Sequence, residues 1–181
     1  MIAVNRFFIV AFFTFITLLF TNCKEQKVYN MKEHTVKEMD IHRFMGTWQE
    51  VARLCTGKKS NLVAITLETS MDSKGIIHVF LKGHKFTPYG PLRELTGKGK
   101  WDEQRPGIIK NTFFLNFYRD YYILDVDEDY SIAVISNQTG TRLHILSRHS
   151  SLSATEVGSI RDQILSLGYD PRELCWTETY F

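Results

Sequence analysis

Gly46-Thr47-Trp48-Gln49-Glu50-Val51-Ala52-Arg53 begins the part of the chain in which short β-prone runs alternate with turn sequences. This part continues to Arg148 without helical periodicity, a pattern typical of an antiparallel barrel or sandwich. About eight strands are enough to close an up-and-down barrel, which removes exposed sheet edges. The runs expected to be strands are Gly46–Cys55, Asn61–Thr69, Ile76–His84, Leu92–Trp101, Ile108–Leu115, Tyr121–Val126, Tyr130–Ser136 and Thr141–Arg148.

One helix is expected after the last of these strands. Ser153-Ala154-Thr155-Glu156 is a capping-box sequence, and Gly168 is a typical C-terminal stop. Between them Val157, Ile160, Ile164 and Leu167 form one apolar stripe. A helix with a single apolar face must bury it, so we expect it to pack on the outside of the barrel. The fold class is therefore all-β, an eight-stranded antiparallel barrel with one C-terminal α-helix, and Glu173–Thr179 is expected to add a strand beside the first.

The first residues predict export. Arg6 precedes an uncharged run of fourteen residues, Phe7–Phe20. This run fits a signal-peptide core and is shorter than the roughly 20 residues that span a bilayer. A buried core helix is the alternative, but the terminal position and the positive flank favour a signal peptide over residues 1–22.

Cys23 follows the signal directly. Leu19-Phe20-Thr21-Asn22-Cys23 resembles the site at which bacterial lipoproteins are acylated, although Phe20 and Asn22 depart from the usual residues. Acyl chains would hold the domain at a membrane. Residues 23–40 are then a lipidated Cys and a polar tether, and the domain comprises residues 41–181. Ordinary cleavage nearby, with Cys23 incidental, is the other interpretation.

The other two cysteines, Cys55 and Cys175, form an even pair. In an oxidising compartment such a pair suggests a disulfide. Two free buried thiols remain the alternative, because spacing alone does not establish distance.

Composition and motifs argue against several classes of function. The net charge of +2 gives no basic surface for nucleic acid. The sequence contains no metal-ligand spacing among its six histidines, no nucleophile elbow and no phosphate-binding loop. We therefore expect no catalytic residues, no metal, no cofactor and no enzymatic activity.

Three motifs in order make the sequence resemble the lipocalin family. The first is the stretch at residues 46–53, the second Asp125-Val126-Asp127-Glu128-Asp129-Tyr130, and the third Ile145-Leu146-Ser147-Arg148. Lys82-Gly83 and Gly97-Lys98 add to the match, which covers residues 41 to about 176. Within the family, the sequence is most similar to the bacterial lipoprotein lipocalins, with apolipoprotein D and the plant temperature-induced lipocalins next.

The resemblance implies structural roles for Gly46, Trp48 and Arg148. The tryptophan would close one end of the barrel, with the guanidinium over its indole. It also implies a lipophilic ligand, such as a fatty acid (palmitate, for example) or a lysophospholipid, bound and transported or stored at the bacterial envelope. The outer membrane is favoured because Lys24 follows the acylated Cys. Whether the chain is a homodimer is left open.

Alternating residues of a barrel strand face inward, so Arg148 and the motif alignment set the inner face. Asp125, Gly97 and Gly99 are placed inside by this alternation, the glycines leaving room for ligand. His144 is either a ligand contact or a satisfied core histidine, and Arg142 pairs with a head group or lies in water at the rim. The residues expected to bind ligand are Ile65, Leu67, Ile77, Val79, Leu81, Leu95, Asn111, Phe113, Tyr121, Ile123, Ala133, Ile135, His144 and Leu146.

A barrel filled by these same side chains is the competing interpretation. The chain would then be a lipid-anchored interaction protein that binds a partner or a membrane through the apolar loops Phe86–Pro91 or Leu115–Tyr118. A lipocalin-fold enzyme is a third, weaker alternative. Cys55 is the only thiol expected near the barrel mouth, and a disulfide with Cys175 would leave it unable to act as a nucleophile.

Overall fold

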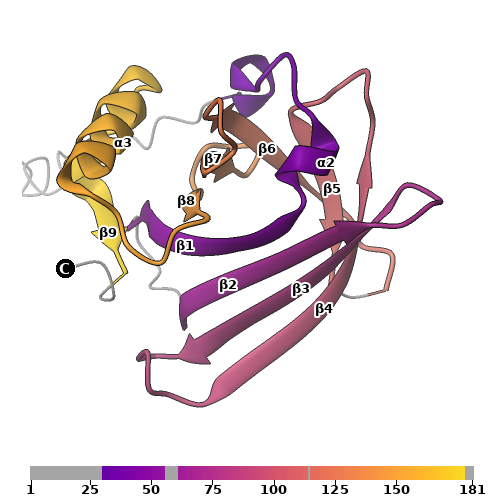
Figure 1. Ribbon diagram of the computed structural model, residues 1–181, viewed down its shortest axis with the longest axis horizontal. Coiled ribbons are helices and arrows are strands. Elements are labelled where there is room, and N and C mark those ends of the chain that lie inside the picture. The colour runs from indigo at the N-terminus through magenta and orange to yellow at the C-terminus, as the bar shows by residue number, and fades with distance from the viewer. Residues whose placement is uncertain (1–29, 56–60, 114, 178–181) are drawn as a thin grey trace, which may run out of the picture.

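A closed eight-stranded antiparallel barrel forms the body of the protein (Figure 1). The computed structural model describes residues 30–55, 61–113 and 115–177. Neighbours in sequence pair in the order β2 to β8, β8 pairs with β1, and the β1–β2 pairing closes the ring. The strands are β1 (Gly46–Leu54), β2 (Leu62–Met71), β3 (Ile76–Lys85), β4 (Leu92–Trp101), β5 (Ile108–Thr112), β6 (Arg119–Val126), β7 (Ile132–Ser136) and β8 (Leu143–Ser147). The expected fold class is confirmed.

The strands have very unequal lengths. β2, β3 and β4 have 10 residues each, whereas β5, β7 and β8 have 5. β5 pairs only with residues 98–101 of β4, so the other half of β4 extends beyond it. The β3–β4 hairpin therefore projects past the rest of the wall at one end (Figure 1).

The helix α3 (Ala154–Ser166) packs on the outside of the barrel, as expected. Ser153 and Glu156 form the capping box, and Ile160 and Ile164 are fully buried. They pack with side chains that point away from the barrel interior, among them Val134 and Ile145. Burying this stripe holds the helix, because a short helix is marginal on its own.

A short ninth strand, β9 (Leu174–Trp176), follows the 3-10 turn η3 (Pro171–Glu173) and pairs with β1. It is shorter than the expected Glu173–Thr179, whose last residues lie outside the described part. The pairing places Cys175 opposite Arg53, and Cys175 forms a disulfide with Cys55, with Cα atoms 5.6 Å apart. The disulfide fixes the end of β1 at the edge of the barrel mouth.

Residues 30–40, expected to belong to a polar tether, pack against the barrel. The 3-10 turn η2 (Met31–His34) buries Met31, whose backbone N–H donates to Gln138. The N–H of Val36 donates to Ile123, which ties this segment along β6. The expected signal peptide and Cys23 lie outside the described residues. None of the helices in the described part has the length and apolar character needed to span a membrane.

One end of the barrel is closed by α2 (Ile41–Phe44) and Trp48. The indole of Trp48 is fully buried and its Nε1–H donates to the Phe44 carbonyl. The guanidinium carbon of Arg148 lies 3.7 Å from the indole centroid. Its N–H groups donate to carbonyls of residues 43, 44, 45, 47 and 130, which ties α2, β1 and the turn between β6 and β7 together. Desolvation lowers the pKa of Arg148, but a guanidinium stays charged.

Gly46 is required at this closed end. Its φ of +110° lies in a region that side chains rarely adopt, and a Cβ there would lie 2.9 Å from Arg148 Nη1. Gly46, Trp48 and Arg148 therefore interlock as structural residues of the closed end, and the open end of the barrel is the opposite one.

Candidate ligand-binding site

The inner face of the barrel contains the predicted residues, with the parity that the sequence indicated. Eight of them pack in the same apolar cluster as Trp48: Leu67, Ile77, Val79, Phe113, Ile123, Ala133, Ile135 and Leu146. Strand register or direct contact places the remaining six on the same face: Ile65, Leu81, Leu95, Asn111, Tyr121 and His144. Ile109 also belongs to this cluster. It was not among the predicted residues, although it lies two residues before Asn111 and so on the same face of the strand. Contact of these residues with a ligand stays a prediction.

Burial divides the inner face into two halves. Near the closed end Ile77, Val79 and Ile123 are at most 1% exposed, so this half is filled by its own side chains. Toward the open end Leu81 and Tyr121 are only partly buried, and Leu95 is 43% exposed. The two interpretations of the barrel therefore apply to different halves: the floor is packed, and an accessible apolar wall lies above it.

Asp125 does not face the interior, and this prediction was wrong. A β-bulge shifts the register of β6 between Ile123 and Asp125, so Asp125 pairs with Val134, which faces α3. Val126 takes the inward position instead and packs in the inner cluster. Burial raises the pKa of Asp125, while a hydrogen bond from Gln163 of α3 opposes that shift.

The glycines of β4 do not leave room for a ligand, contrary to expectation. A Cβ on Gly97 would lie 2.8 Å from the ring of Phe113, and one on Gly99 would lie 2.3 Å from Asn111 Oδ1. The missing side chains therefore let Phe113 and Asn111 lie over β4. Asn111 Oδ1 is buried here, and no hydrogen-bond donor lies within reach of it in the described part of the chain.

A charged cluster inside the open half was not predicted. Glu50 is 2% exposed, and its carboxylate accepts hydrogen bonds from Arg53 and from His144 Nδ1. Glu50 shares the inner face with Trp48 because it pairs with Leu146. A second bulge, between Glu50 and Ala52, turns Arg53 inward, where it pairs with His144. His144 is thus both partnered, as a core histidine would be, and 32% exposed toward the mouth.

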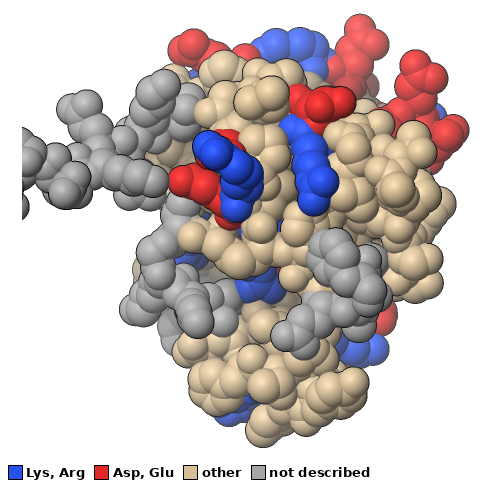
Figure 2. Space-filling model, turned by 90° about the vertical axis from the view of Figure 1, so that its left-hand side faces the viewer, with Lys and Arg blue, Asp and Glu red and all other residues tan. Residues whose placement is uncertain are grey.

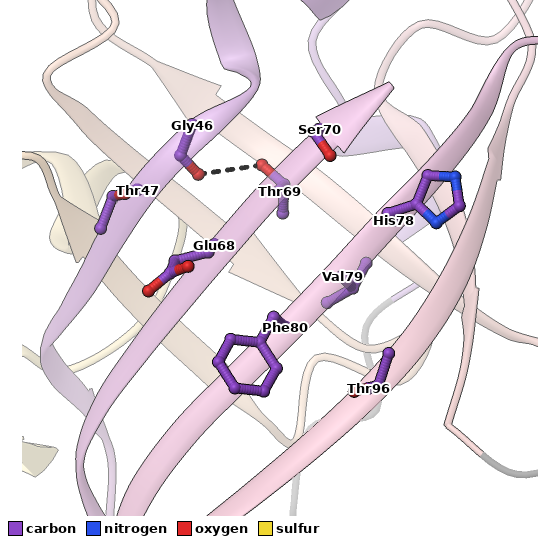
Figure 3. A pocket seen from close by; sticks show the side chains of 9 residues that line it. All are labelled: Gly46, Thr47, Glu68, Thr69, Ser70, His78, Val79, Phe80 and Thr96. Atoms are coloured by element: carbon purple, nitrogen blue, oxygen red, sulfur yellow. Dashed lines mark hydrogen bonds between the residues drawn. The ribbon is translucent and has the colours of Figure 1, made fainter. Parts of the chain in front are cut away.

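A separate hollow lies on the outer surface of β1–β4 (Figure 3). It encloses about 350 Å³ and is lined by outward-facing side chains such as Glu68, His78 and Phe80. This hollow is shallow and open, and most of the residues that line it face away from the barrel interior. The barrel mouth, which combines an apolar wall with convergent polar groups, is the better candidate for a small-molecule site.

Metal ligands and nucleophiles are the groups that would give the interior a catalytic centre. Residues 30–55, 61–113 and 115–177 contain no group of three or more His, Cys, Asp or Glu side chains able to hold a metal ion. Cys55, the one thiol near the mouth, is oxidised to the disulfide and cannot act as a nucleophile in that state.

The sequence and the fold match known proteins. The family model described as a lipocalin-like domain matches residues 39–179. The outer membrane lipoprotein Blc of Vibrio cholerae is 27% identical over 145 residues, covering 79% of this chain and 84% of the relative. The protein of the same name from Citrobacter freundii is 28% identical over 152 residues, covering 79% and 81%. The structure of lobster apocrustacyanin A1 superimposes with a TM-score of 0.63, at 17% identity and covering 84% and 87% of the two chains. At that identity the structural match shows the fold alone.

Proposed function

Because the chain belongs to the lipocalin family, we propose that it binds a lipophilic molecule, a fatty acid or a lysophospholipid, in the open half of its barrel and stores or transports it. Binding or transport of a hydrophobic ligand is what the family and the Blc relatives support in general. The observation that supports this site is the accessible apolar wall above the packed floor. Leu81, Leu95 and Tyr121 lie on it and would lose exposed surface to an acyl chain.

We propose the cell envelope as the place of action. Two curated relatives are named outer membrane lipoproteins, which supports an envelope location. Acylation of Cys23 would anchor the domain there, and changing Cys23 to Ser should move it from the membrane to the soluble fraction. Membrane retention of the variant would contradict the anchor without affecting ligand binding.

We further propose that the protein acts without catalysis. The polar groups of the interior point to recognition, since Glu50 is engaged by two partners and Cys55 is in a disulfide. Turnover of a bound lipid by the purified protein would contradict this part of the proposal.

The test of ligand binding compares two leucines. Leu81→Gln and Leu95→Gln place an amide in the open-half wall without adding charge, and we expect each to weaken binding of a fluorescent fatty acid by about tenfold or more, the effect of an unpaired amide on an apolar contact. Leu165→Gln is the control, because Leu165 is 62% exposed on the helix outside the barrel. Equal affinity for all three variants and wild type would overturn the site.

A second candidate function rests on the loops of the open end. Phe86 and Tyr89 of the β3–β4 loop and Leu115 and Phe117 of the β5–β6 loop are all more than half exposed. Exposed apolar patches of this kind bind partners or membranes, and here we propose a lipid surface. Replacing Phe86 and Phe117 by Ser should lower binding of the Cys23→Ser chain to lipid vesicles. If the chain binds vesicles in this way but binds no fatty acid, the interaction function stands alone.

A further inference from the structure

Three side chains with formal or potential charge meet inside the open half of the barrel, from β1 and β8. Glu50 lies at the centre, with Arg53 and His144 donating to its two carboxylate oxygens. Arg53 also donates a 2.8 Å hydrogen bond to the carbonyl oxygen of Leu62 on β2. The exposed fractions of the side chains rise outward, from 1% for Glu50 to 16% for Arg53 and 32% for His144. The cluster is therefore buried at its acidic centre and accessible on its basic side.

Stability gives little reason for such a cluster. Burying an ion pair costs desolvation energy that its mutual attraction often does no more than offset, and apolar side chains of similar size commonly do as well. The neighbouring inner positions are apolar, since Leu146 pairs with Glu50 and Ile135 pairs with His144. A charged cluster among apolar neighbours is typical of a polar subsite that orients a ligand.

Charge on the inner face of the open half is predominantly basic. Strand register places Lys85, Arg93 and Arg119 on that face, opposite Leu62, Gly83 and Asn111. Glu50 is the acidic residue on the inner face of the described strands, and it is neutralised by Arg53. In Figure 2, which looks onto the open end, Lys and Arg atoms lie deep in the central hollow and no acidic atoms are visible there. Such a mouth attracts anions.

The cluster retains hydrogen-bond donors for a ligand. A guanidinium has five N–H groups, and the two bonds of Arg53 use two of them. An ionised carboxylate only accepts, so Nδ1 of His144 carries the proton that Glu50 binds, and Nε2 of a neutral ring is then an acceptor. The donors that the cluster offers to an anion therefore come from Arg53. Glu50 is thus a positioning residue that fixes both side chains.

We propose that Arg53, held in place by Glu50 beside His144, forms a subsite for an anionic head group, a carboxylate or a phosphate, on the lipophilic ligand. This inference rests on the proposed ligand binding of the barrel and names the class of ligand. The acyl chain then lies along the apolar wall of the open half, and Arg53 supplies the charge-assisted hydrogen bonds that hold its head.

The test uses three ligands with the same saturated chain: palmitate, palmitoyl lysophosphatidate and neutral hexadecanol. Their Kd values are measured by displacement of a fluorescent probe from the exported Cys23→Ser chain, which needs no detergent. The wild-type barrel should bind one or both anions more tightly than hexadecanol, and the tighter anion distinguishes carboxylate from phosphate. Equal affinity for all three overturns the subsite, whereas failure of all three to bind overturns the proposed function with it.

Arg53→Gln should weaken anion binding by roughly tenfold to a hundredfold and leave hexadecanol within about twofold. Arg105→Gln is the matched control, because it removes the same charge from the β4–β5 turn at the closed end. If Arg53→Gln lowered the affinity for all three ligands equally, Arg53 would only stabilise the barrel wall. That result would overturn the subsite but not ligand binding.

A measurement on the unaltered barrel covers the case in which Arg53→Gln fails to fold. Salt screens the attraction between an anion and a basic mouth. Affinity for the anionic ligands should therefore fall as ionic strength rises, while that for hexadecanol stays constant. Parallel salt dependence of charged and neutral ligands would contradict the proposal.

Discussion

Arg53 Nη1 donates a 2.8 Å hydrogen bond to the carbonyl oxygen of Leu62, across the gap where β1 and β2 no longer pair. The backbone ladder between these strands ends at Gln49 and Thr66. The wall at the mouth is thus completed by a side chain, and that side chain belongs to the proposed head-group subsite. Ligand recognition and closure of the barrel depend on the same residue, which is why the variants at Arg53 need a neutral ligand as reference.

Replacing Trp48 by Ala should destabilise the protein by about 3–5 kcal/mol, the usual cost of truncating a large buried aromatic. Trp48 is 0% exposed, and Arg148 would lose its cation–π partner. Chemical denaturation measures the loss. Phe117→Ala is the control, because Phe117 is 71% exposed, and it should change stability by less than about 0.5 kcal/mol. A loss at Trp48 as small as the control's would contradict its place as the barrel floor.

Two glycine substitutions should change the stability of the fold in opposite directions. Gly46→Ala forces a side chain to a φ of +110° and toward Arg148, so we expect a loss of about 1–3 kcal/mol. Gly158 lies within α3, where an added Cβ would meet no atom within 4 Å, and Gly158→Ala should stabilise by about 0.5–1 kcal/mol. Thermal unfolding of the two variants measures both changes. If Gly46→Ala left the stability unchanged, the contacts of Arg148 at this position would tolerate a side chain.

Asp125→Asn should stabilise the protein at neutral pH. Burial raises the pKa of Asp125 in the folded protein, so ionisation above that pKa costs stability, and the cost disappears as pH falls and the carboxyl is protonated. The gain of the variant over wild type should therefore be largest at pH 7 and shrink as pH falls through the raised pKa toward 3.8, the ordinary value. Denaturation at several pH values tests this, and a gain independent of pH would assign the effect to packing against α3.

The strands and the helix could be predicted because their signals are local. Leu92–Trp101 was predicted with the bounds that β4 has, since Pro91 and the Asp102 turn limit it on both sides. Ile108–Leu115 was predicted too long. β5 ends at Thr112, and Leu115 has a positive φ of 49°. Leu rarely adopts this backbone conformation, so the sequence gives no sign of it.

The inner face was predicted where strands are regular and not where they bulge. Strict alternation from Trp48 puts Ala52 inside, but the bulge after Glu50 puts Arg53 there instead. Strict alternation from Ile123 puts Asp125 inside, and the bulge of β6 reverses that. A bulge depends on how two strands fit together, so the sequence of one strand does not reveal it. The charged cluster could therefore be found only in three dimensions.

The measurement that tests the ligand-binding barrel most directly is native mass spectrometry of the protein isolated from its own cells. We predict a bound lipid with an acidic head group on the wild-type protein, released by collisional activation and depleted in Leu81→Gln but not in Leu165→Gln. A spectrum of ligand-free protein alone, from a preparation that also fails to bind added palmitate and hexadecanol, would contradict the proposed function.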